Sequence, residues 1–280
     1  MRTKRFVKGW GVVLRSLPLK ALLRSLARLP LLLLVLLGLA PPAGAEETDS
    51  LVIMTYNIHT RNYDVEAIAQ VIRESGADIV LIQEVTDYLD RDLTNAVADV
   101  SPYAAVHIYP RLRLGLGAFS RTPILNDEFT VFTGDASRQR LQIDAEGRLL
   151  TFYNIHLANP THAGPRYNPA ALTEGVSALL EMIDAEPAPL VVAGDFNTAS
   201  FSADYQRLAD ALKDGFGQAG RGLGFTYPAD SLLPVLRIDY VFHSDDLSAL
   251  QAEVLGDSGG SDHYPVRVEL GLAGLTDAGE

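Results

Sequence analysis

The sequence has no cysteine among its 280 residues, and this absence narrows both its chemistry and its architecture. It excludes a disulfide framework, a thiolate nucleophile and a cysteine-based zinc site. It also excludes an N-terminal lipid anchor of the lipoprotein type, which is attached to a cysteine. Glycine and proline do not gather into an interdomain linker, and no repeat follows the N-terminal segment. We therefore expect one large domain with a substantial core.

Positive charge is scarce outside the N-terminal segment. Residues 1–45 contain eight Lys or Arg and no acid, a net charge of +8. The remaining residues carry 15 bases against 35 acids, a net charge of −20. Phosphate backbones are bound mainly through Lys and Arg, so this composition disfavours a general nucleic-acid binder. Local phosphate chemistry around a metal ion stays compatible with it.

The N-terminal segment has the layout of a secretory signal peptide. Residues 1–28 are basic, Leu31–Ala40 is apolar, and Ala43-Gly44-Ala45 forms a small-x-small cleavage site. The apolar run is about half of the ~20 residues needed to span a bilayer. We predict cleavage after Ala45 and export to the periplasm or the extracellular space. The basic region is long, so an uncleaved membrane anchor with the domain outside, or a start codon placed too early, stays open.

One strand-like stretch organises the rest of the chain. The apolar run Pro189–Ala193 predicts a buried strand, and Gly194, Asp195 and Asn197 follow it. Side chains two residues apart on an extended chain point the same way, so Asp195 and Asn197 face the space beyond the strand end. Gly-Asp-Phe-Asn is also a good turn sequence. Other strand-like runs that end in Asn, Glu, His or Asp favour a site built from strand ends.

The remaining pattern mixes strands with helices. A strand at Leu51–Tyr56, a helix capped by Asp64 and ended by Gly76, and a strand at Ile79–Ile82 predict a βαβ-like unit. Two strands at Gln139–Ile143 and Arg148–Ile155 predict a hairpin. Hairpins together with crossovers predict α/β layers with mixed sheets. Further expected elements are a helix at 88–97 before a loop to 110, a strand at 111–123 near a sheet edge, helices at 169–185 and 203–213, a loop at 217–236, and strands at 237–242 and 264–270.

Eight polar residues collect at the ends of these strands. Each has an ordinary structural explanation: Glu84 can cap a helix, Asp239 can pair with Arg237, and a single His is often a satisfied core residue. Eight such explanations together are far less plausible than one shared site. The oxygen ligands Asn57, Glu84 and Asp262 suit a hard cation such as Mg²⁺ better than zinc. The set is Asn57, Glu84, His156, Asp195, Asn197, Asp239, Asp262 and His263.

Seven short motifs resemble, in order, those of the endonuclease/exonuclease/phosphatase superfamily, which includes deoxyribonucleases, abasic-site endonucleases, inositol polyphosphate 5-phosphatases and bacterial sphingomyelinases. The resemblance implies a four-layer α/β sandwich, two packed mixed β-sheets flanked by helices, with the site at one rim. It implies Mg²⁺- or Mn²⁺-assisted hydrolysis of a phosphoester by water. The motifs are Thr55-Tyr-Asn-Ile-His59, Gln83-Glu-Val85, Phe119-Ser-Arg121, Asn154-Ile-His-Leu157, Gly194-Asp-Phe-Asn197, Arg237-Ile-Asp-Tyr240 and Ser261-Asp-His-Tyr-Pro265.

The resemblance also implies roles for these residues. Glu84 is the main metal ligand, with Asn57 and Asp262 nearby, and Asp195 and Asn197 orient the attacking water or the phosphate. His263, held by Asp239, is the proton acceptor or a phosphate-stabilising imidazolium. His156 donates to a phosphate oxygen or protonates the leaving group; deoxyribonuclease-like members carry His here and abasic endonucleases carry Tyr. His59 is expected behind the ligands, and His107, His162 and His243 have no motif support.

We expect a catalytic domain over residues 46–270, a flexible tail over 271–280, and a monomer without an obligate protein partner.

Three functions are compatible with the sequence. The acidic charge favours a small-molecule or lipid phosphoester as substrate over nucleic acid. A secreted nuclease is the alternative, for which Arg111 and Arg113, or Arg138 and Arg140, offer a local phosphate clamp. A non-catalytic binding module is the third. The N-terminal segment would place the domain close to a membrane if it is retained.

Overall fold

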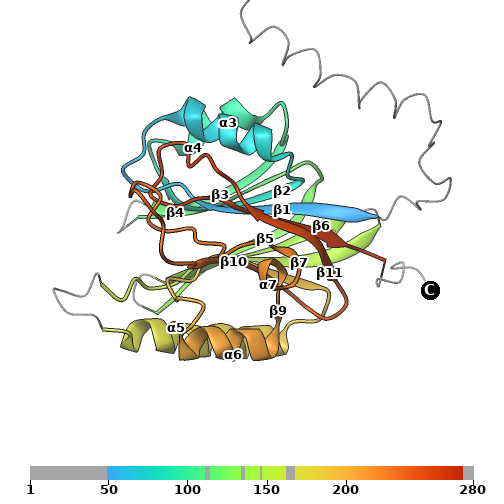
Figure 1. Ribbon diagram of the computed structural model, residues 1–280. Helices are drawn as coiled ribbons and strands as arrows, with labels where there is room; N and C mark the ends of the chain where they lie inside the picture. Colours follow the sequence, from blue (N-terminus) through green and yellow to red (C-terminus); the bar gives the residue numbers. More distant parts are fainter. Residues whose placement is uncertain (1–48, 111–113, 134–135, 146, 162–167, 274–280) are drawn as a thin grey trace, which may run out of the picture. The chain divides into compact units, whose positions relative to one another are not determined.

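The computed structural model describes residues 49–110, 114–133, 136–145, 147–161 and 168–273 (Figure 1). The predicted signal peptide lies outside these ranges, as does the tail from residue 274 onward. Within the described part of the chain, no helix is both long and apolar enough to cross a membrane.

Two six-stranded sheets form the centre of the fold. The first has the order β11-β12-β1-β2-β4-β3 and the second the order β5-β6-β7-β8-β10-β9. Each sheet holds one parallel pair, β1–β2 or β7–β8, and its other pairs are antiparallel. Both sheets are therefore mixed, as predicted. The strands are β1 (Ser50–Asn57), β2 (Ile79–Thr86), β3 (Tyr103–Tyr109), β4 (Leu114–Ser120), β5 (Ile124–Thr133), β6 (Ala136–Ala145), β7 (Arg148–His156), β8 (Leu190–Asp195), β9 (Lys213–Asp214), β10 (Asp239–His243), β11 (Ser248–Val254) and β12 (Val266–Gly271).

Helices cover the outer faces of both sheets and complete four layers. Figure 1 shows α3 (Val65–Ser75) and α4 (Asp90–Val97) over the first sheet, and α5 (Ala170–Ala185) and α6 (Ala203–Ala211) over the second. The short α7 (Gly215–Ala219) packs against β11. The predicted Asp64 cap is present, since Asp64 accepts a hydrogen bond from the Ala67 amide, and Ser202 caps α6 in the same way by accepting from the Tyr205 amide. The predicted four-layer sandwich is confirmed.

Three apolar clusters hold the layers together. The central one lies between the sheets and contains Ile53, Leu81, Phe152 and Val191, among others. The other two lie under α3 and α4 and under α5 and α6. β1 packs across the central core against β8 and β10, so the ends of these strands meet at one rim. This packing brings side chains from both sheets together.

Asn154 ties the two sheets together with polar contacts inside the core. Its amide donates to the carbonyls of Ile82 and Gly117 on the first sheet, at 3.1 and 3.0 Å. Its oxygen accepts from Gln83 Nε2 at 2.8 Å. Asn154 and Gln83 are fully buried, so each bond is made away from water and is costly to lose. The sequence motifs around both residues therefore serve the sheet packing as well as the rim.

The edges of the sheets differ from the expectation. β3 occupies part of a segment expected to be a loop, and β5 and β11 were not expected at all. The predicted 203–213 helix ends at Ala211, and residues 213–214 instead form β9. β3, β5, β9 and β11 are the four edge strands. Their exposed side chains interrupt the apolar pattern by which buried strands are recognised. At the C-terminus, Leu272 is buried and donates its backbone N–H to Asp49.

Candidate active site

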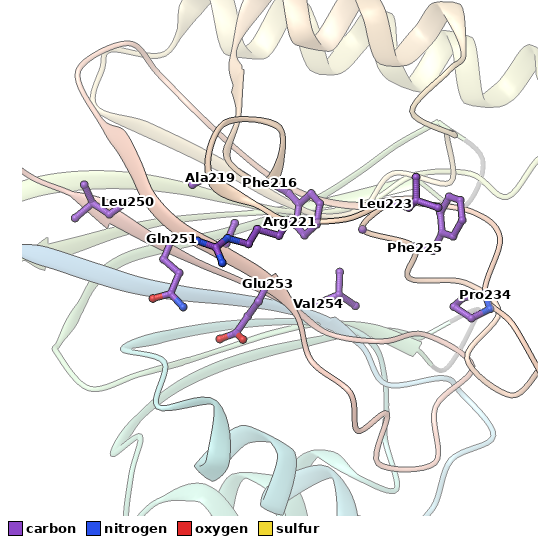
Figure 2. A pocket seen from close by; sticks show the side chains of 12 residues that line it. Phe216, Ala219, Arg221, Leu223, Phe225, Pro234, Leu250, Gln251, Glu253 and Val254 are labelled. Atoms are coloured by element: carbon purple, nitrogen blue, oxygen red, sulfur yellow. The ribbon is translucent and has the colours of Figure 1, made fainter. Parts of the chain in front are cut away.

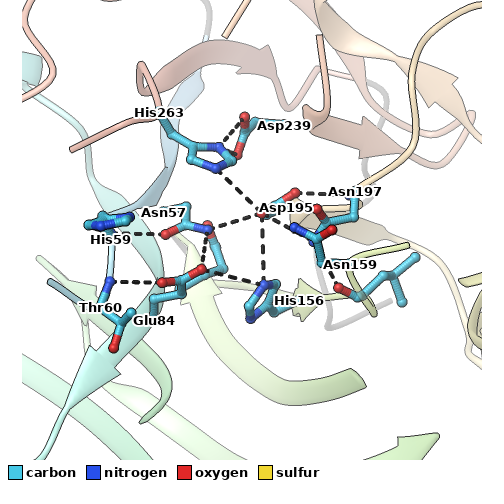
Figure 3. Close-up of polar contacts among 12 residues, drawn as sticks. Asn57, His59, Thr60, Glu84, His156, Asn159, Asp195, Asn197, Asp239 and His263 are labelled. Atoms are coloured by element: carbon cyan, nitrogen blue, oxygen red, sulfur yellow. Dashed lines mark hydrogen bonds and ion pairs between the residues drawn. The ribbon is translucent and has the colours of Figure 1, made fainter. Parts of the chain in front are cut away.

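The parallel pairs deliver four of the predicted residues to one rim (Figure 3). Asn57 ends β1, and Glu84 lies near the end of β2. His156 and Asp195 end β7 and β8 and are direct register partners. Each pair is joined by a helix, so the carboxyl ends of its strands point the same way. Two βαβ units from different sheets therefore meet with their carboxyl ends together.

Asn57 connects the two sheets at this rim. Its Nδ2 donates to Asp195 Oδ2 at 3.0 Å and to Glu84 Oε1 at 3.2 Å. Its Oδ1 accepts from the His59 amide at 3.0 Å. Asn57 is fully buried, so the side chain holds the two carboxylates in place from behind the site. A carbonyl oxygen has two lone pairs, and one of them stays available to a cation.

Glu84 is presented by an irregular piece of backbone. The register between β2 and β4 shifts between Gln83 and Val85, which marks a bulge at Glu84. The Thr60 amide donates to Glu84 Oε2 at 2.7 Å. Burial raises the pKa of Glu84, but His156, the Thr60 amide and Asn57 outweigh this and lower it overall. Glu84 is therefore an ionised carboxylate at neutral pH.

Backbone strain among the described residues is concentrated at this rim. The three non-glycine residues with positive φ are His59 at 61°, Glu84 at 61° and Asn197 at 49°. Residues other than glycine rarely adopt a positive φ, and each one that does lowers the stability of the fold by on the order of 1 kcal/mol or more. All three line the same cavity. Such strain persists where the surrounding structure imposes it, which is typical of functional sites.

Asp195 and Asn197 both face the cavity, as predicted. Asn197 donates its backbone amide to Asp195 Oδ1 at 2.9 Å and its Nδ2 to the Leu157 carbonyl at 2.9 Å. A Cβ at Gly194 would lie 1.9 Å from the Ile155 oxygen, so only glycine fits between β7 and β8 here. Burial raises the pKa of Asp195 to about 6; Asp239 adds to the rise, and His263 and His156 oppose it.

His263 lies between two aspartates. Its Nδ1 is 2.9 Å from Asp239 Oδ2, and its Nε2 is 3.8 Å from Asp195 Oδ2. Burial alone lowers the pKa of His263, but the two carboxylates outweigh it and raise the pKa to about 10. The ring is therefore an imidazolium at neutral pH. Arg237, the alternative partner of Asp239, instead pairs with Asp214 at 2.7 Å.

Asp262 and His263 point to different partners, as expected for neighbours on an extended chain. Asp262 Oδ1 lies 2.8 Å from His59 Nδ1, and both side chains line the cavity, so His59 lies beside Asp262 and not behind it. His156 lies opposite, with Nε2 3.8 Å from Asp195 Oδ2 and 3.9 Å from Glu84 Oε1. Its Nδ1 is buried without a hydrogen-bond partner. The eight predicted residues thus form one connected cluster.

A cavity of about 680 Å³ opens in front of the cluster. Asn57 and Asp239 lie behind the surface, and the other six predicted residues line it. Sequence reasoning missed several lining residues, because they lie on loops that carry no periodic signal. Tyr227 is the most informative of them, with its ring 4.9 Å from that of His263. The missed residues are Thr60, Arg61, Asn159, Pro160, Thr161, Ala199, Phe201, Ser202, Tyr227, Leu236 and Ile238.

Comparison with known families agrees with this geometry. Residues 54–263 match the model of the Endonuclease/Exonuclease/phosphatase family. The chain belongs to this family. Members of the family are hydrolases that act on phosphoesters. The match spans Asn57 to His263 and so includes the whole cluster at the rim.

Solved structures show the same fold at low sequence identity. A family protein from Bacteroides vulgatus has a TM-score of 0.67 and 18% identity, covering 79% of this chain and 98% of its own. The mannosyl-6-phosphatase Bt3783 from Bacteroides thetaiotaomicron has a TM-score of 0.64 and 20% identity, and the match covers 79% of this chain and 99% of that one. Truncated TDP2 from Caenorhabditis elegans has a TM-score of 0.63 and 16% identity, and the match covers 79% of this chain and 98% of that one. A search among curated proteins found no match.

The donor set of this family hydrolase fits a hard divalent cation. Carboxylate and carboxamide oxygens line or adjoin the cavity, and these are the ligands that Mg²⁺ and Mn²⁺ accept. Asp195, Asp239 and His263 also offer one ligand atom each within 4.8 Å of one another. That trio is internally paired through His263, and its Asp239 does not line the cavity, whereas Glu84 and Asp262 both do. We therefore keep Glu84 and Asp262 as the expected ligands.

The basic residues considered as a phosphate clamp lie elsewhere. Arg140 binds Glu186 with two hydrogen bonds of 2.8 and 2.6 Å, and Arg138 lies over the Tyr153 ring. Neither lines the cavity. Arg111 and Arg113 lie outside the described residues.

The histidines without motif support, where the structure describes them, contact residues outside the cavity. His107 pairs with Asp127 at 2.6 Å. His243 is buried and contacts Gln218 and the Ser244 carbonyl. His162 lies outside the described ranges. Neither described ring lines the cavity.

Proposed function

We propose that the protein is an exported, Mg²⁺- or Mn²⁺-dependent phosphoesterase that acts on a small-molecule or lipid phosphoester. The observation that carries the proposal is the convergence of three carboxylates and three imidazoles on one 680 Å³ cavity. The three carboxylates are those of Glu84, Asp195 and Asp262, and the imidazoles are those of His59, His156 and His263. Phosphoryl transfer requires such charge neutralisation and positioning, and no covalent nucleophile.

The metal ion is held by Glu84 and Asp262, with Asn57 Oδ1 in support. When bound, it neutralises phosphate charge and lowers the pKa of water. Asn57 Nδ2 and the Thr60 amide fix the Glu84 carboxylate before any ion arrives. The preformed carboxylates therefore reduce the cost of binding the ion.

The remaining residues position water and phosphate. Asp195, supported by Asn57 and the Asn197 amide, accepts a hydrogen bond from the attacking water. Its raised pKa supports a role in proton transfer near neutral pH. His263, charged beside Asp239, stabilises the phosphate oxygens. His156 lies across the cavity from His263 and donates to the phosphate or to the leaving oxygen.

The electrostatics of the cavity support a small or lipid substrate over nucleic acid. Among the described lining residues, Arg61 is the one Lys or Arg, beside three acids. A polynucleotide needs several cations along its path, and the described wall offers one. The export proposal depends on the basic and apolar pattern of residues 1–45.

Hydrolysis of a phosphoester panel tests this proposal. The full chain is assayed on bis(p-nitrophenyl) phosphate, p-nitrophenyl phosphate, plasmid DNA and phospholipids, with Mg²⁺, Mn²⁺ or EDTA. We expect turnover that EDTA abolishes and that falls at least about 100-fold in His156→Gln. His107→Gln is the matched control, because His107 is also paired with a carboxylate but lies outside the cavity.

Other results would redirect the proposal. Preferred cleavage of DNA would favour the nuclease function. A folded protein that turns over nothing with either metal would favour a binding module. Equal loss in His107→Gln and His156→Gln would show that the assay reports stability and not the site. Export is checked separately, by locating the protein and sequencing its N-terminus, where a start at Glu46 is expected.

A further inference from the structure

Two kinds of side chain line the cavity of about 680 Å³. One kind comprises the carboxylates and imidazoles described above. The other is apolar or aromatic, and we call this set the apolar wall; it adjoins the first at Tyr227, whose ring lies 4.9 Å from that of His263. The apolar wall consists of Ala199, Phe201, Tyr227, Leu236 and Ile238.

Phe201 forms the outer part of this wall and is 82% exposed. Its backbone is fixed on both sides, because the Ser202 amide donates to the Ala199 carbonyl at 2.9 Å and Ser202 caps α6. The ring is therefore displayed at the cavity by an ordered turn. Exposing a phenylalanine in this way forgoes the stabilisation that burial would give. A ligand that covers the ring would recover it.

The hairpin 227–236 continues the apolar wall outward. Tyr227 and Leu236 pair at its base, and both line the cavity. Leu232 at its tip is 97% exposed and Leu233 is 71% exposed. Together with Phe201, and with Leu223, which lines a different cavity, these are the four most exposed large apolar side chains in the described chain. Two of the four therefore lie on the same loop as the lining residues Tyr227 and Leu236.

The opposite side of the same loop is also apolar. Figure 2 shows Leu223, Phe225 and Pro234 lining a second cavity of about 810 Å³ between α7 and β11. That cavity holds one acid, Glu253, and one base, Arg221, among its described lining residues. Its described lining therefore has no imidazole and no group of carboxylates. Of these two cavities, the first is the one that places apolar side chains beside several carboxylates and imidazoles.

We propose that the apolar wall is a subsite for the hydrocarbon part of the substrate, so that the substrate is an amphiphilic phosphoester. This inference rests on the proposed function for the position of the phosphate. The shared chemistry is a phosphate next to an apolar group, presented either by a free molecule or by a lipid. Arg61 is the one Lys or Arg among the described lining residues, so an anionic substituent would find few partners.

Binding of non-hydrolysable phosphonates tests the subsite without requiring turnover. Methylphosphonate and hexylphosphonate are titrated calorimetrically into the full chain with Mg²⁺, below the micelle concentration. Each methylene moved out of water strengthens binding by about fourfold. We therefore expect hexylphosphonate to bind at least about tenfold more tightly than methylphosphonate. Equal affinity for the two would overturn the inference.

Variants at the wall and elsewhere locate the effect. Phe201→Ser should reduce the hexyl-to-methyl ratio to about three or less, whereas Phe201→Leu should retain most of it. Leu149→Ser is the matched control, because Leu149 is an exposed apolar residue near the opposite end of β7 from His156. An unchanged ratio in Phe201→Ser, or an equal fall in Leu149→Ser, would contradict the assignment.

The outcome is separable from that of the proposed function. Tighter binding of hexylphosphonate than of methylphosphonate, without hydrolysis of any phosphoester, would support the subsite and contradict the proposed enzymatic function. Hydrolysis with equal binding of the two phosphonates would support the enzymatic function and contradict the subsite. Mixing the chain with phosphatidylcholine vesicles or with monomeric short-chain phosphatidylcholine then separates the sources. Faster turnover on vesicles indicates a lipid substrate, and faster turnover on monomers indicates a free amphiphile.

Discussion

Two buried charged clusters in this protein are built on opposite principles. Under α6, Arg237 pairs with Asp214 at 2.7 Å, and the Tyr205 hydroxyl donates to the same carboxylate at 2.7 Å. The Arg237 guanidinium also lies over three aromatic rings. One positive charge faces one negative charge, and the arrangement is complete without a ligand.

The cluster at the rim is not balanced in this way. Glu84, Asp195, Asp239 and Asp262 face two imidazoles, His156 and His263, with His59 beside Asp262. Its backbone is strained at His59 and Glu84, whereas Arg237 and Asp214 have no positive φ. The Arg237–Asp214 cluster therefore stabilises the fold, whereas the rim cluster has more carboxylates than imidazoles and is completed by a ligand.

The largest effect is expected at Asp195. Asp195→Asn keeps the size of the side chain but removes the charge that faces His263 and His156. We expect kcat/KM for the preferred phosphoester to fall by about 10³-fold or more, because the charged group acts in a desolvated site. The free energy of unfolding in urea should fall by less than about 2 kcal/mol, since part of the hydrogen bonding is kept. A large loss of stability with retained activity would show that Asp195 stabilises the fold and does not take part in catalysis.

Asp214→Ala should show the opposite profile. Removing one partner of a buried ion pair leaves Arg237 uncompensated and costs about 3–5 kcal/mol. Urea unfolding followed by circular dichroism measures this loss. At a temperature where the variant is still folded, its kcat/KM should stay within about threefold of the unchanged chain. Loss of activity without loss of stability would show that the two clusters are coupled.

Added Mg²⁺ should stabilise the folded protein by binding at the rim cluster. A cation that binds only the folded state, at a free concentration 100 times its dissociation constant, stabilises that state by about 2.7 kcal/mol. Thermal unfolding with and without Mg²⁺ should therefore show a rise in Tm that Glu84→Gln largely removes. Asp214→Ala should keep the full rise from its lower baseline. An equal rise in all three proteins would indicate a general salt effect.

The smallest effect concerns acid stability at a second balanced pair. Glu186 accepts two hydrogen bonds from Arg140 and one from Tyr153. The Arg140 hydrogen bond lowers the pKa of Glu186 below its usual 4.5. A lowered folded-state pKa contributes stability that is present above about pH 4.5 and lost as the pH falls through the folded value. Glu186→Gln should flatten this acid-side slope by about 1–2 kcal/mol, measured by unfolding from pH 6 to 3.

Most of the sandwich could be predicted because its central strands are buried on both faces. Runs such as Leu51–Tyr56, which is interrupted only by Thr55, and Val191–Ala193 are apolar, and that pattern needs no tertiary context. The edge strands β3 and β11 have many exposed residues, so their pairing depends on neighbours that the local sequence does not show. Their strand identity therefore came only from the structure.

The sequence was enough to predict which eight residues form the cluster, but not the backbone geometry that presents them or the loop residues around them. Polar residues at strand ends identified all eight members of the cluster. The bulge at Glu84 and its left-handed backbone left no local sign, because a glutamate there carries no conformational signature. Phe201 was missed for a related reason: an exposed aromatic residue in a loop is common, and only the cavity beside it gives it meaning.

The division of the site between two sheets has a consequence for when activity can first appear. Neither parallel pair alone contains a complete set of groups, and Asn57 reaches Asp195 only after the sheets have packed. His263 is supplied near the end of the described chain, 206 positions after Asn57. A chain emerging from the ribosome therefore cannot assemble the cluster until synthesis has passed His263. If the chain is exported unfolded, as proposed, the site is assembled only after the chain has crossed the membrane and folded.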